Sequence, residues 1–153
     1  MNLNNYTIKS QEAIQQAVQL AAGNGQQAIE PAHILKGILS TDENVTPFIL
    51  KKLNINSASF DRLVDSIISS YPKVSGGQPH LSSAANTALG KASTYLKEYN
   101  DEFVSIEHLL LGLLHSGDST ASMMKDAGIK EKELKAAIAE LRKGERVTSQ
   151  SQE

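Results

Sequence analysis

The stretch that decides the fold is AIEPAHILKGIL, from Ala28 to Leu39, because it returns later in the chain as FVSIEHLLLGLL, from Phe103 to Leu114. His33 falls on His108, which sets the offset between the copies at 75 residues (108 minus 33). Three further pairs match at this offset: Leu35 and Leu110, Gly37 and Gly112, and Leu39 and Leu114. The chain therefore contains an internal repeat, which has to be recognised before any single motif is interpreted.

The same register continues on both sides of this stretch. Upstream, the matched residues are Ala13, Ile14 and Ala17 with Ala88, Leu89 and Ala92. Downstream, with one residue deleted, they are Ile55, Phe60, Val64 and Ile67 with Ile129, Leu134, Ile138 and Leu141. Two such units would pack face to face and leave a groove along their seam. Most repeats exist to complete a core, so the duplication by itself favours a packing role over a binding role.

Apolar residues recur at helical spacing through nearly the whole chain. Ile14, Ala17, Val18 and Ala21 lie at i, i+3, i+4 and i+7, which is the pattern of an amphipathic helix. No stretch alternates apolar and polar residues in the manner of a strand. We predict an all-α fold of two pseudo-twofold-related four-helix repeats, with eight helices of about 8 to 17 residues and no sheet.

Several residues mark where these helices begin and end. A capping residue before proline predicts helix starts at Glu30-Pro31 and at Thr46-Pro47. Hydroxyl caps predict two more starts, at Ser82/Ser83 and at Ser105, and glycine terminators are expected at Gly25 and Gly128. The stretch from Ser69 to Ser83 carries two prolines and a glycine pair, so we expect it to link the two repeats.

Composition excludes several functional classes. The chain has 153 residues, 40% of them hydrophobic, and 15 basic against 17 acidic residues give a net charge of −2. Nucleic acid is therefore a poor partner. No apolar run approaches a membrane span and no signal peptide is apparent. Cysteine is absent, which fits a reducing compartment, so we expect a cytoplasmic protein without membrane contact.

The two repeat signatures, together with YTIKSQEAI (residues 6–14) and GERVTSQSQE (residues 144–153), resemble the Clp amino-terminal domain family over essentially the whole chain. The IEP form of the first copy and the tail are most similar to the protein-disaggregase branch of that family. The resemblance implies a stress-response chaperone with two AAA+ ATPase modules after Glu153, a hexameric full-length assembly and an Hsp70-type partner system. It implies ATP and Mg for the full-length protein and no cofactor for this fragment, which we expect to be a monomer when isolated.

This resemblance sets the expected domain boundaries. The double repeat would occupy residues 1–145, and residues 146–153 would begin a linker to the ATPase modules. Within the domain, repeat one covers about residues 7–70, the internal linker residues 69–83 and repeat two about residues 82–143. The polar tail from Arg142 to Glu153 has no apolar residue except Val147, so we expect it to have nothing to pack against.

The resemblance also places candidate binding residues. Family positions implicated in binding unfolded or aggregated polypeptide fall on Thr7, Asp101 and Glu107, and those that line the family groove fall on Lys91, Tyr95 and His108. Local chemistry offers simpler roles, because Thr7 can cap a helix, Asp101 can be a solvated loop residue, and Glu107 lies near the positive end of a helix dipole. From the sequence alone, we expect Thr7→Ala and Glu107→Ala to weaken substrate binding and leave folding intact.

Catalysis and metal binding find no support in the sequence. No G-x-x-x-x-G-K-[ST] phosphate loop and no G-x-S-x-G nucleophile motif is present. The four histidines are His33, His80, His108 and His115; the equivalent places of His33 and His108 favour a shared packing or hydrogen-bonding role over coordination. Of the adjacent Met123 and Met124, we expect one to be core and the other could belong to a pliable binding surface.

Two other functions remain as alternatives. The first is an adaptor-docking or phosphoarginine-binding domain of a Clp protease ATPase. Phosphoarginine recognition in the family uses a glutamate in each copy, whereas here Glu107 has Ala32 as its counterpart. The second is a small helical enzyme, which would need a perturbed acid and base pair in a closed pocket.

Overall fold

The structure, a computed structural model, describes residues 2–74 and 76–152. Within these residues it has eight helices of 8 to 17 residues, which confirms the all-α prediction. The first repeat contains α1 (Ile8–Gly23), α2 (Pro31–Thr41), α3 (Val45–Lys52) and α4 (Ser57–Ser70), and the second contains α5 (Ser83–Tyr99), α6 (Ile106–Leu113), α7 (Ser119–Ala127) and α8 (Glu131–Arg142). Two short strands, β1 (Ala28–Ile29) and β2 (His80–Leu81), lie between helices.

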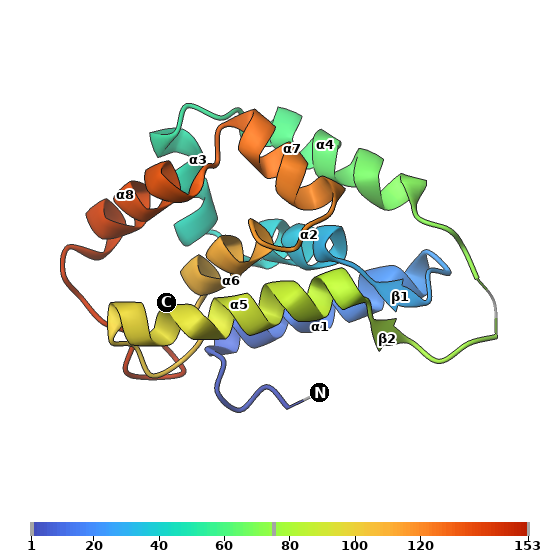
Figure 1. The fold of residues 1–153 in the computed structure, drawn as a ribbon, viewed down its shortest axis with the longest axis horizontal. Helices are drawn as coiled ribbons and strands as arrows, with labels where there is room; N and C mark the ends of the chain where they lie inside the picture. Colours follow the sequence, from blue (N-terminus) through green and yellow to red (C-terminus); the bar gives the residue numbers. More distant parts are fainter. Residues whose placement is uncertain (1, 75, 153) are drawn as a thin grey trace.

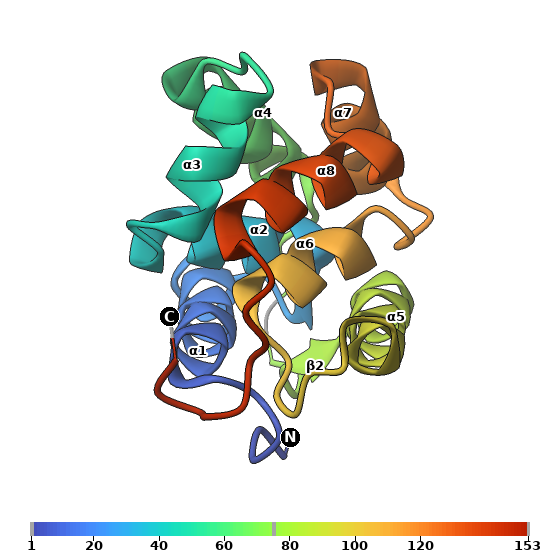
Figure 2. The ribbon, with the colours of Figure 1, turned by 90° about the vertical axis from the view of Figure 1, so that its left-hand side faces the viewer.

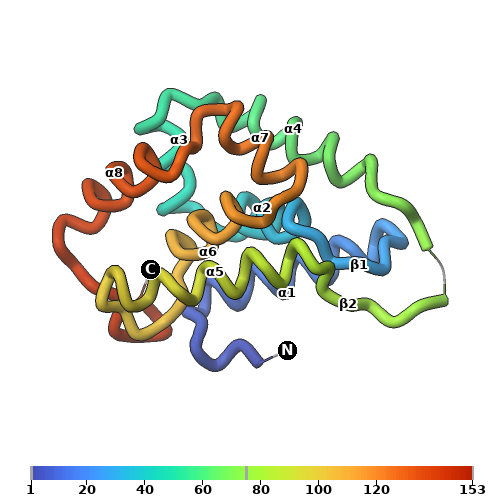
Figure 3. Tube along the Cα trace, viewed as in Figure 1, coloured from blue at the N-terminus to red at the C-terminus, as the bar shows by residue number. Residues whose placement is uncertain are grey.

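The helices are arranged in layers around α2 and α6. Figure 2 shows α2 and α6 in the middle, with α1 and α5 on one side and the α3, α4, α7 and α8 helices on the other. The same order is visible along the trace in Figure 3. One continuous core of buried apolar side chains runs through both repeats. No helix in the described residues is long and apolar enough to cross a membrane.

Most of the predicted helix boundaries are confirmed. Ser82 caps α5 by accepting a hydrogen bond from the Ala85 N–H, and α6 begins directly after Ser105. Pro31 is the first residue of α2, where its missing N–H leaves no hydrogen bond unmade. Gly25 and Gly128 both have positive φ angles directly after a helix, as expected of terminators.

The predicted start of α3 after Thr46 is wrong, because the helix begins at Val45. The Asp42 carboxylate accepts hydrogen bonds from the Asn44, Val45 and Thr46 N–H groups at 3.0, 3.1 and 2.6 Å. It therefore satisfies the free donors at the start of the helix. Pro47 still lies within the first turn, where a missing N–H is tolerated.

The prediction that no sheet would form is also wrong. β1 and β2 pair in parallel, with Ala28 opposite His80 and Ile29 opposite Leu81, and an isolated parallel bridge joins Tyr6 to Val104. At the repeat offset of 75, Ile29 corresponds to Val104 and Tyr6 to Leu81. Each repeat thus pairs the residues before its second helix with the residues before the first helix of the other repeat. Two-residue strands are too short to show a period in the sequence.

The matched glycines, Gly37 and Gly112, lie where two helices touch in each repeat. A Cβ atom on Gly37 would lie 2.1 Å from the Ala13 carbonyl oxygen, and one on Gly112 would lie 2.3 Å from that of Ala88. Both distances are far below contact, so only glycine lets α2 lie against α1 and α6 lie against α5. The internal repeat therefore conserves a backbone contact between helices.

The C-terminal segment contradicts the expectation that it has nothing to pack against. Val147 is only 3% exposed, and the backbone of the segment bonds to residues of both repeats. A single β-branched side chain in a polar stretch is enough to anchor it, because its neighbours bond through main-chain atoms. The expectation that residues 146–153 begin a linker stays a prediction, with Glu153 outside the described residues.

Candidate functional site

An open apolar groove lies where α4 of the first repeat meets α7 of the second. It encloses about 470 Å³. Its lining residues are Leu63, Ser66, Ile67, Ser119, Ser122, Met123, Asp126 and Ala127. Leu63 is 46% exposed, which is high for a large aliphatic side chain. The groove therefore offers apolar surface from both repeats to a ligand.

The opposite seam, where α3 meets α8, is the symmetry counterpart of this groove and is bridged by an ion pair. There the ammonium of Lys52 pairs with the Glu140 carboxylate across the seam at 2.8 Å. At the 74-residue offset of this part of the repeat, the corresponding residues of the open groove are Asp126 and Ser66, and the uncharged serine forms no ion pair with the aspartate. The two copies therefore differ: the α3/α8 seam carries an ion pair, and the α4/α7 seam is mostly apolar.

A buried charge cluster lies in the second repeat, between α6 and the end of α8. Arg142 donates to Asp101 Oδ2 at 2.7 Å and to Glu107 Oε2 at 2.9 Å. His108 Nε2 lies 2.8 Å from the same Asp101 oxygen. The Asp101 and His108 side chains are fully buried, and those of Glu107 and Arg142 are 5% and 9% exposed. Such charges are tolerated in the interior only when they are paired in this way.

Both equivalent histidines are neutral hydrogen-bonding residues. Nδ1 of His33 accepts from the Glu30 N–H and Nδ1 of His108 accepts from the Ser105 N–H, so Nε2 carries the proton in each ring. Burial lowers the pKa of His33 to about 4. Burial also lowers the pKa of His108, against the opposing effect of Asp101. The predicted shared hydrogen-bonding role is confirmed.

The two copies differ in what the histidine binds. His33 Nε2 donates to the Gln26 amide oxygen at 2.7 Å, whereas His108 donates to the Asp101 carboxylate, and Gln26 and Asp101 are 75 residues apart. Ile68 stands in copy one where Arg142 stands in copy two. The first repeat thus has a neutral version of the cluster, and the second a charged one.

The structure brings together three of the six predicted binding residues. Asp101, Glu107 and His108 belong to the charge cluster, whereas Thr7 lies apart at the start of α1. Thr7 is fully buried, and its hydroxyl oxygen accepts from the Ser10 N–H at 3.2 Å, so its predicted capping role is confirmed. Contact of these residues with a substrate stays a prediction.

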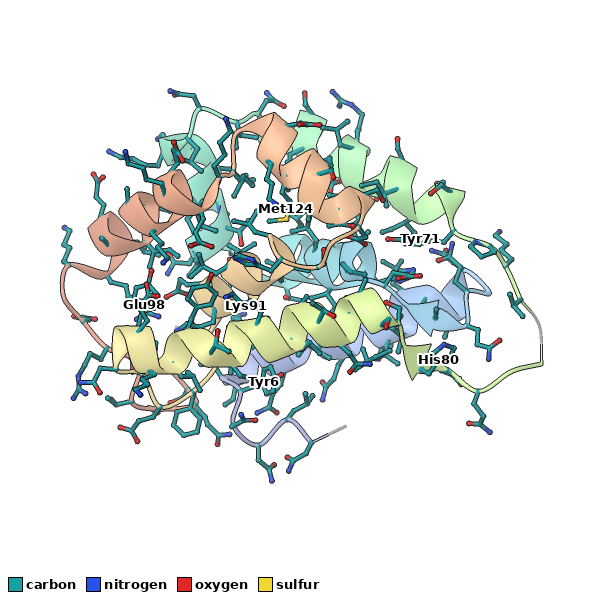
Figure 4. All side chains as sticks on the ribbon, in the orientation of Figure 1. Tyr6, Tyr71, His80, Lys91, Glu98 and Met124 are labelled. Carbon is teal, nitrogen blue, oxygen red and sulfur yellow. The ribbon has the colours of Figure 1, made fainter. Side chains whose placement is uncertain are left out.

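Lys91, labelled in Figure 4, and Tyr95 form a separate group on α5, next to Glu131 and Lys135 of α8. The Tyr95 hydroxyl donates to Glu131 at 2.9 Å, and the ammonium groups of Lys91 and Lys135 lie 5.5 and 5.3 Å from its ring centre. Tyr95 is only 4% exposed. Burial, and next the bond to Glu131, raises the pKa of Tyr95. The structure therefore covers this ring with charged side chains, and it does not line the open seam.

The sequence-based reasoning missed two parts of the site. Arg142 was assigned only to the polar tail, although it joins Asp101 and Glu107. The open groove was expected at the seam but not from α4 and α7, whose Leu63/Ile67 and Met123/Ala127 pairs each have i, i+4 spacing. Met124 is core and Met123 lines the groove, so the expectation that one of the pair is core is confirmed (Figure 4). Among the described residues no cluster suits a metal ion.

Known proteins share both the sequence and the fold. The family model described as the Clp repeat N-terminal domain matches residues 5–127. The chain is 58% identical over 153 residues to the chaperone protein ClpB of Bacteroides thetaiotaomicron and 48% identical to that of Porphyromonas gingivalis, in each case over the whole of this chain and 18% of the relative. The chain thus spans about a fifth of these relatives' length.

Two solved structures show the same fold. The Hsp104 N-terminal domain from Candida albicans superposes with a TM-score of 0.81 at 24% identity, covering 97% of this chain and 98% of that one. A ClpV N-domain in complex with a VipB peptide superposes with a TM-score of 0.74 at 18% identity, covering 94% and 93%. The expected resemblance to disaggregase amino-terminal domains is confirmed.

Proposed function

The chain belongs to the Clp repeat N-terminal domain family, and on that basis we propose that it is the substrate-recognition domain of an ATP-dependent disaggregase chaperone. In this proposal the domain binds its substrate non-covalently and catalyses no reaction. Its ligand is an apolar segment of unfolded or aggregated polypeptide, held in the groove between α4 and α7.

The observation that carries the proposal is the asymmetry of the two seams. Apolar side chains of both repeats meet at this groove, where Leu63 is exposed and Met123 is half-buried, and apolar surface rimmed by polar residues can serve as an interaction site. At the counterpart seam Lys52 and Glu140 form an ion pair, so the fold does not require an apolar surface at such a seam. The open seam is therefore best explained by a ligand.

The chemistry of the groove suits weak and unselective binding. Its side chains are aliphatic or small, with serine hydroxyls and Asp126 at the rim, and Met123 can adapt to ligands of different shape. A short segment would bury less than a standard interface of about 1,200 Å², so we expect dissociation constants of roughly 10 μM to 1 mM. Weak binding suits a substrate that must be passed on.

The test is Met123→Glu, which places a charge in the groove, compared with Lys125→Glu, which places the same charge on an exposed face of α7. Titration of each variant with a permanently unfolded model protein, followed by NMR, should show binding about tenfold weaker for Met123→Glu and nearly unchanged for Lys125→Glu. Equal affinities in both variants, with both folded by circular dichroism, would refute the groove.

The structure does not favour the alternative of a phosphoarginine-binding domain. The Glu107 carboxylate is already bound by Arg142 of the same chain and is 4% exposed. Its counterpart in the first repeat is Ala32, also buried. We therefore keep unfolded polypeptide as the ligand.

For the whole protein we propose the role of a chaperone, which the name of its relatives indicates. ATP and Mg²⁺ would be held by modules outside these 153 residues, because the sequence contains no phosphate-binding loop. A hexameric assembly, an Hsp70-type partner system and a cytoplasmic location belong to the same proposal. Sequencing the gene beyond Glu153 tests it, since a phosphate-binding loop must follow.

A further inference from the structure

The last residues of the described chain lie on the domain as a segment without helix or strand. Residues 143–152, called here the C-terminal strap, leave the end of α8 and run to the side of α1 (Figure 2). Val147 is the only buried residue of the strap. The strap is therefore held by one apolar anchor, by its main chain and by the side chains of Arg146 and Gln150, which donate to main-chain carbonyls of the domain.

The main-chain contacts of the strap are those that any extended polypeptide could make. The Val147 N–H donates to Asp101 Oδ1 at 2.8 Å, and the Glu102 N–H donates to the Val147 carbonyl at 2.8 Å. Farther along, the Ile8 N–H donates to the Gln150 carbonyl at 2.7 Å. Every residue has a carbonyl, and every residue except proline has an N–H, so these three bonds do not depend on the strap's side chains. Two side chains add to them: Arg146 Nη1 donates to the Asn100 carbonyl at 3.2 Å, and Gln150 Nε2 donates to the Asn4 carbonyl at 2.5 Å.

The surface that receives the strap is built from both repeats. Ile8 is the first residue of α1, so its N–H has no partner within the helix. Asp101 and Glu102 follow α5 in the second repeat. We call Ile8, Asp101 and Glu102 the strap site. It lies beside the Tyr6–Val104 bridge that joins the repeats.

The strap has the features of a segment that opens locally. Lys143 and Gly144 both have positive φ, at 50° and 88°, where the chain turns away from α8. Most strap side chains are exposed, and few apolar contacts hold them. Segments of this kind open at a lower free energy than the core of the same protein.

We propose that the strap site is a docking site for extended polypeptide. The strap occupies the site in this structure, and an unfolded substrate binds there only after the strap has left. The proposal rests on the proposed function for the class of ligand, but it concerns a second site, on the far side of α6 from the α4/α7 groove. While the strap is bound, both Asp101 oxygens are used: Oδ1 by Val147, and Oδ2 by His108 and Arg142.

Residues of both repeats hold the two ends of the strap in place. Asp101 holds the strap directly, Thr7 precedes the Ile8 N–H that binds Gln150, and Glu107 positions Arg142 at the end of α8 where the strap begins. A cavity of about 180 Å³ remains under the strap, lined by Glu107 and Val147 among others. One Glu107 oxygen there is buried without a partner. These residues act on the substrate by controlling the occupant of the strap site.

The test uses the 153-residue chain with Val147→Asp, which should release the strap, and Ser149→Asp as the matched control. Ser149 is exposed, and its side chain bonds only within the strap, to Ser151. The probe is a synthetic peptide with the sequence of residues 145–151, ERVTSQS. In NMR titrations the peptide should bind Val147→Asp at roughly 10 μM to 1 mM and shift the Ile8 and Glu102 amides.

The same peptide should bind the parent chain and Ser149→Asp at least about tenfold more weakly, because their own strap competes. A peptide with aspartate in place of its valine should bind none of them. A Val147→Asp chain that is folded but does not bind the ERVTSQS peptide would overturn the proposal. Equal binding to all three chains would overturn it as well.

A second measurement covers the case in which Val147→Asp does not fold. Native-state hydrogen exchange on the parent chain should show the Ile8, Glu102 and Val147 amides opening together, faster than amides within α2 and α6. Exchange of these three amides as slow as the core would contradict the strap's release. Met123→Glu should leave peptide binding at the strap site unchanged, so failure of the groove and failure of the strap site are told apart.

Discussion

Arg142 is the residue on which the buried charges of the second repeat depend. Its guanidinium binds two carboxylates and lies 5.1 Å from the Tyr99 ring centre. Glu107 supplies one of those carboxylates from inside the domain, so the sequence-based expectation that Glu107→Ala leaves folding intact has to be revised. Removing one partner of a buried pair leaves the other charge under-compensated.

Glu107→Ala should lower the free energy of unfolding by about 2–3 kcal/mol, because Arg142 keeps Asp101 as its remaining partner. Glu98→Ala is the control. Its carboxylate pairs with Lys135 but is 48% exposed, so its loss should cost less than about 1 kcal/mol. Urea unfolding followed by circular dichroism measures both; equal losses would show that the cluster contributes no more than a surface pair.

His33 makes stability depend on pH. Its pKa is lowered to about 4 in the folded state, against about 6.5 in an unfolded chain. As the pH falls from 6.5 to 5, the His33 ring becomes protonated in the unfolded chain but stays neutral in the folded chain. The stability that is present above pH 6.5 is therefore progressively lost. We expect a loss of about 2 kcal/mol over this range.

The variant His33→Gln should remove that part of the pH dependence, since glutamine does not titrate. Urea unfolding at pH 6.5 and pH 5, for the parent and the variant, gives the difference directly. His80→Gln is the control, because His80 is exposed and its replacement should leave the slope unchanged. Parallel slopes for the parent and His33→Gln would mean that the buried ring is not protected from protonation.

At the scale of the elements, helix contacts through glycine fix how each repeat packs. Gly112 lets α6 lie against the α5 backbone, as Gly37 does for α2 and α1. This is why α1 with α2, and α5 with α6, are the closest helix pairs of the fold, as Figure 1 shows for the second of them. The repeat signature therefore encodes a spacing between helices.

Gly112→Ala should destabilise the domain by about 2–3 kcal/mol, because its Cβ would lie 2.3 Å from the Ala88 carbonyl oxygen and force the helices apart. Gly90→Ala in α5 is the matched control, since nothing lies within 4 Å of its Cβ position. It should raise stability by about 0.5–1 kcal/mol through helix propensity. Thermal unfolding should move the two melting temperatures in opposite directions; a shared sign would contradict the close contact.

At the scale of the whole molecule the two repeats fold as one unit. In the part of the chain that the structure describes, strand pairing occurs only across the repeat boundary, Ile29 with Leu81 and Tyr6 with Val104. Buried side chains of both repeats form one apolar cluster. Neither repeat can satisfy its strand hydrogen bonds or cover its apolar face alone.

A fragment of residues 1–75 should therefore be largely unfolded when isolated, and so should residues 76–153. Mixing the two should restore helical structure in a concentration-dependent way, because each supplies the missing strand partner and core face of the other. Circular dichroism of the separate and mixed fragments is the measurement. A cooperatively melting single fragment would show that the repeats are independent.

The sequence determined the local structure and the duplication. Helical spacing predicted eight helices, Ser82, Ser105 and Pro31 marked their starts, and the 75-residue offset identified the matched histidines and glycines. These features depend on neighbours within one or two helical turns or on identity between copies. Both can be read along a chain.

Only the tertiary structure decided the features that depend on partners far apart in sequence. The strand pairs, the bond of Arg142 to Asp101, the docking of Val147 and the two seams each join residues at least 41 positions apart (142 minus 101). No local pattern records such contacts, because they exist only when distant segments meet. Folding therefore decided which seam stayed open, and the open seam carries the proposed function.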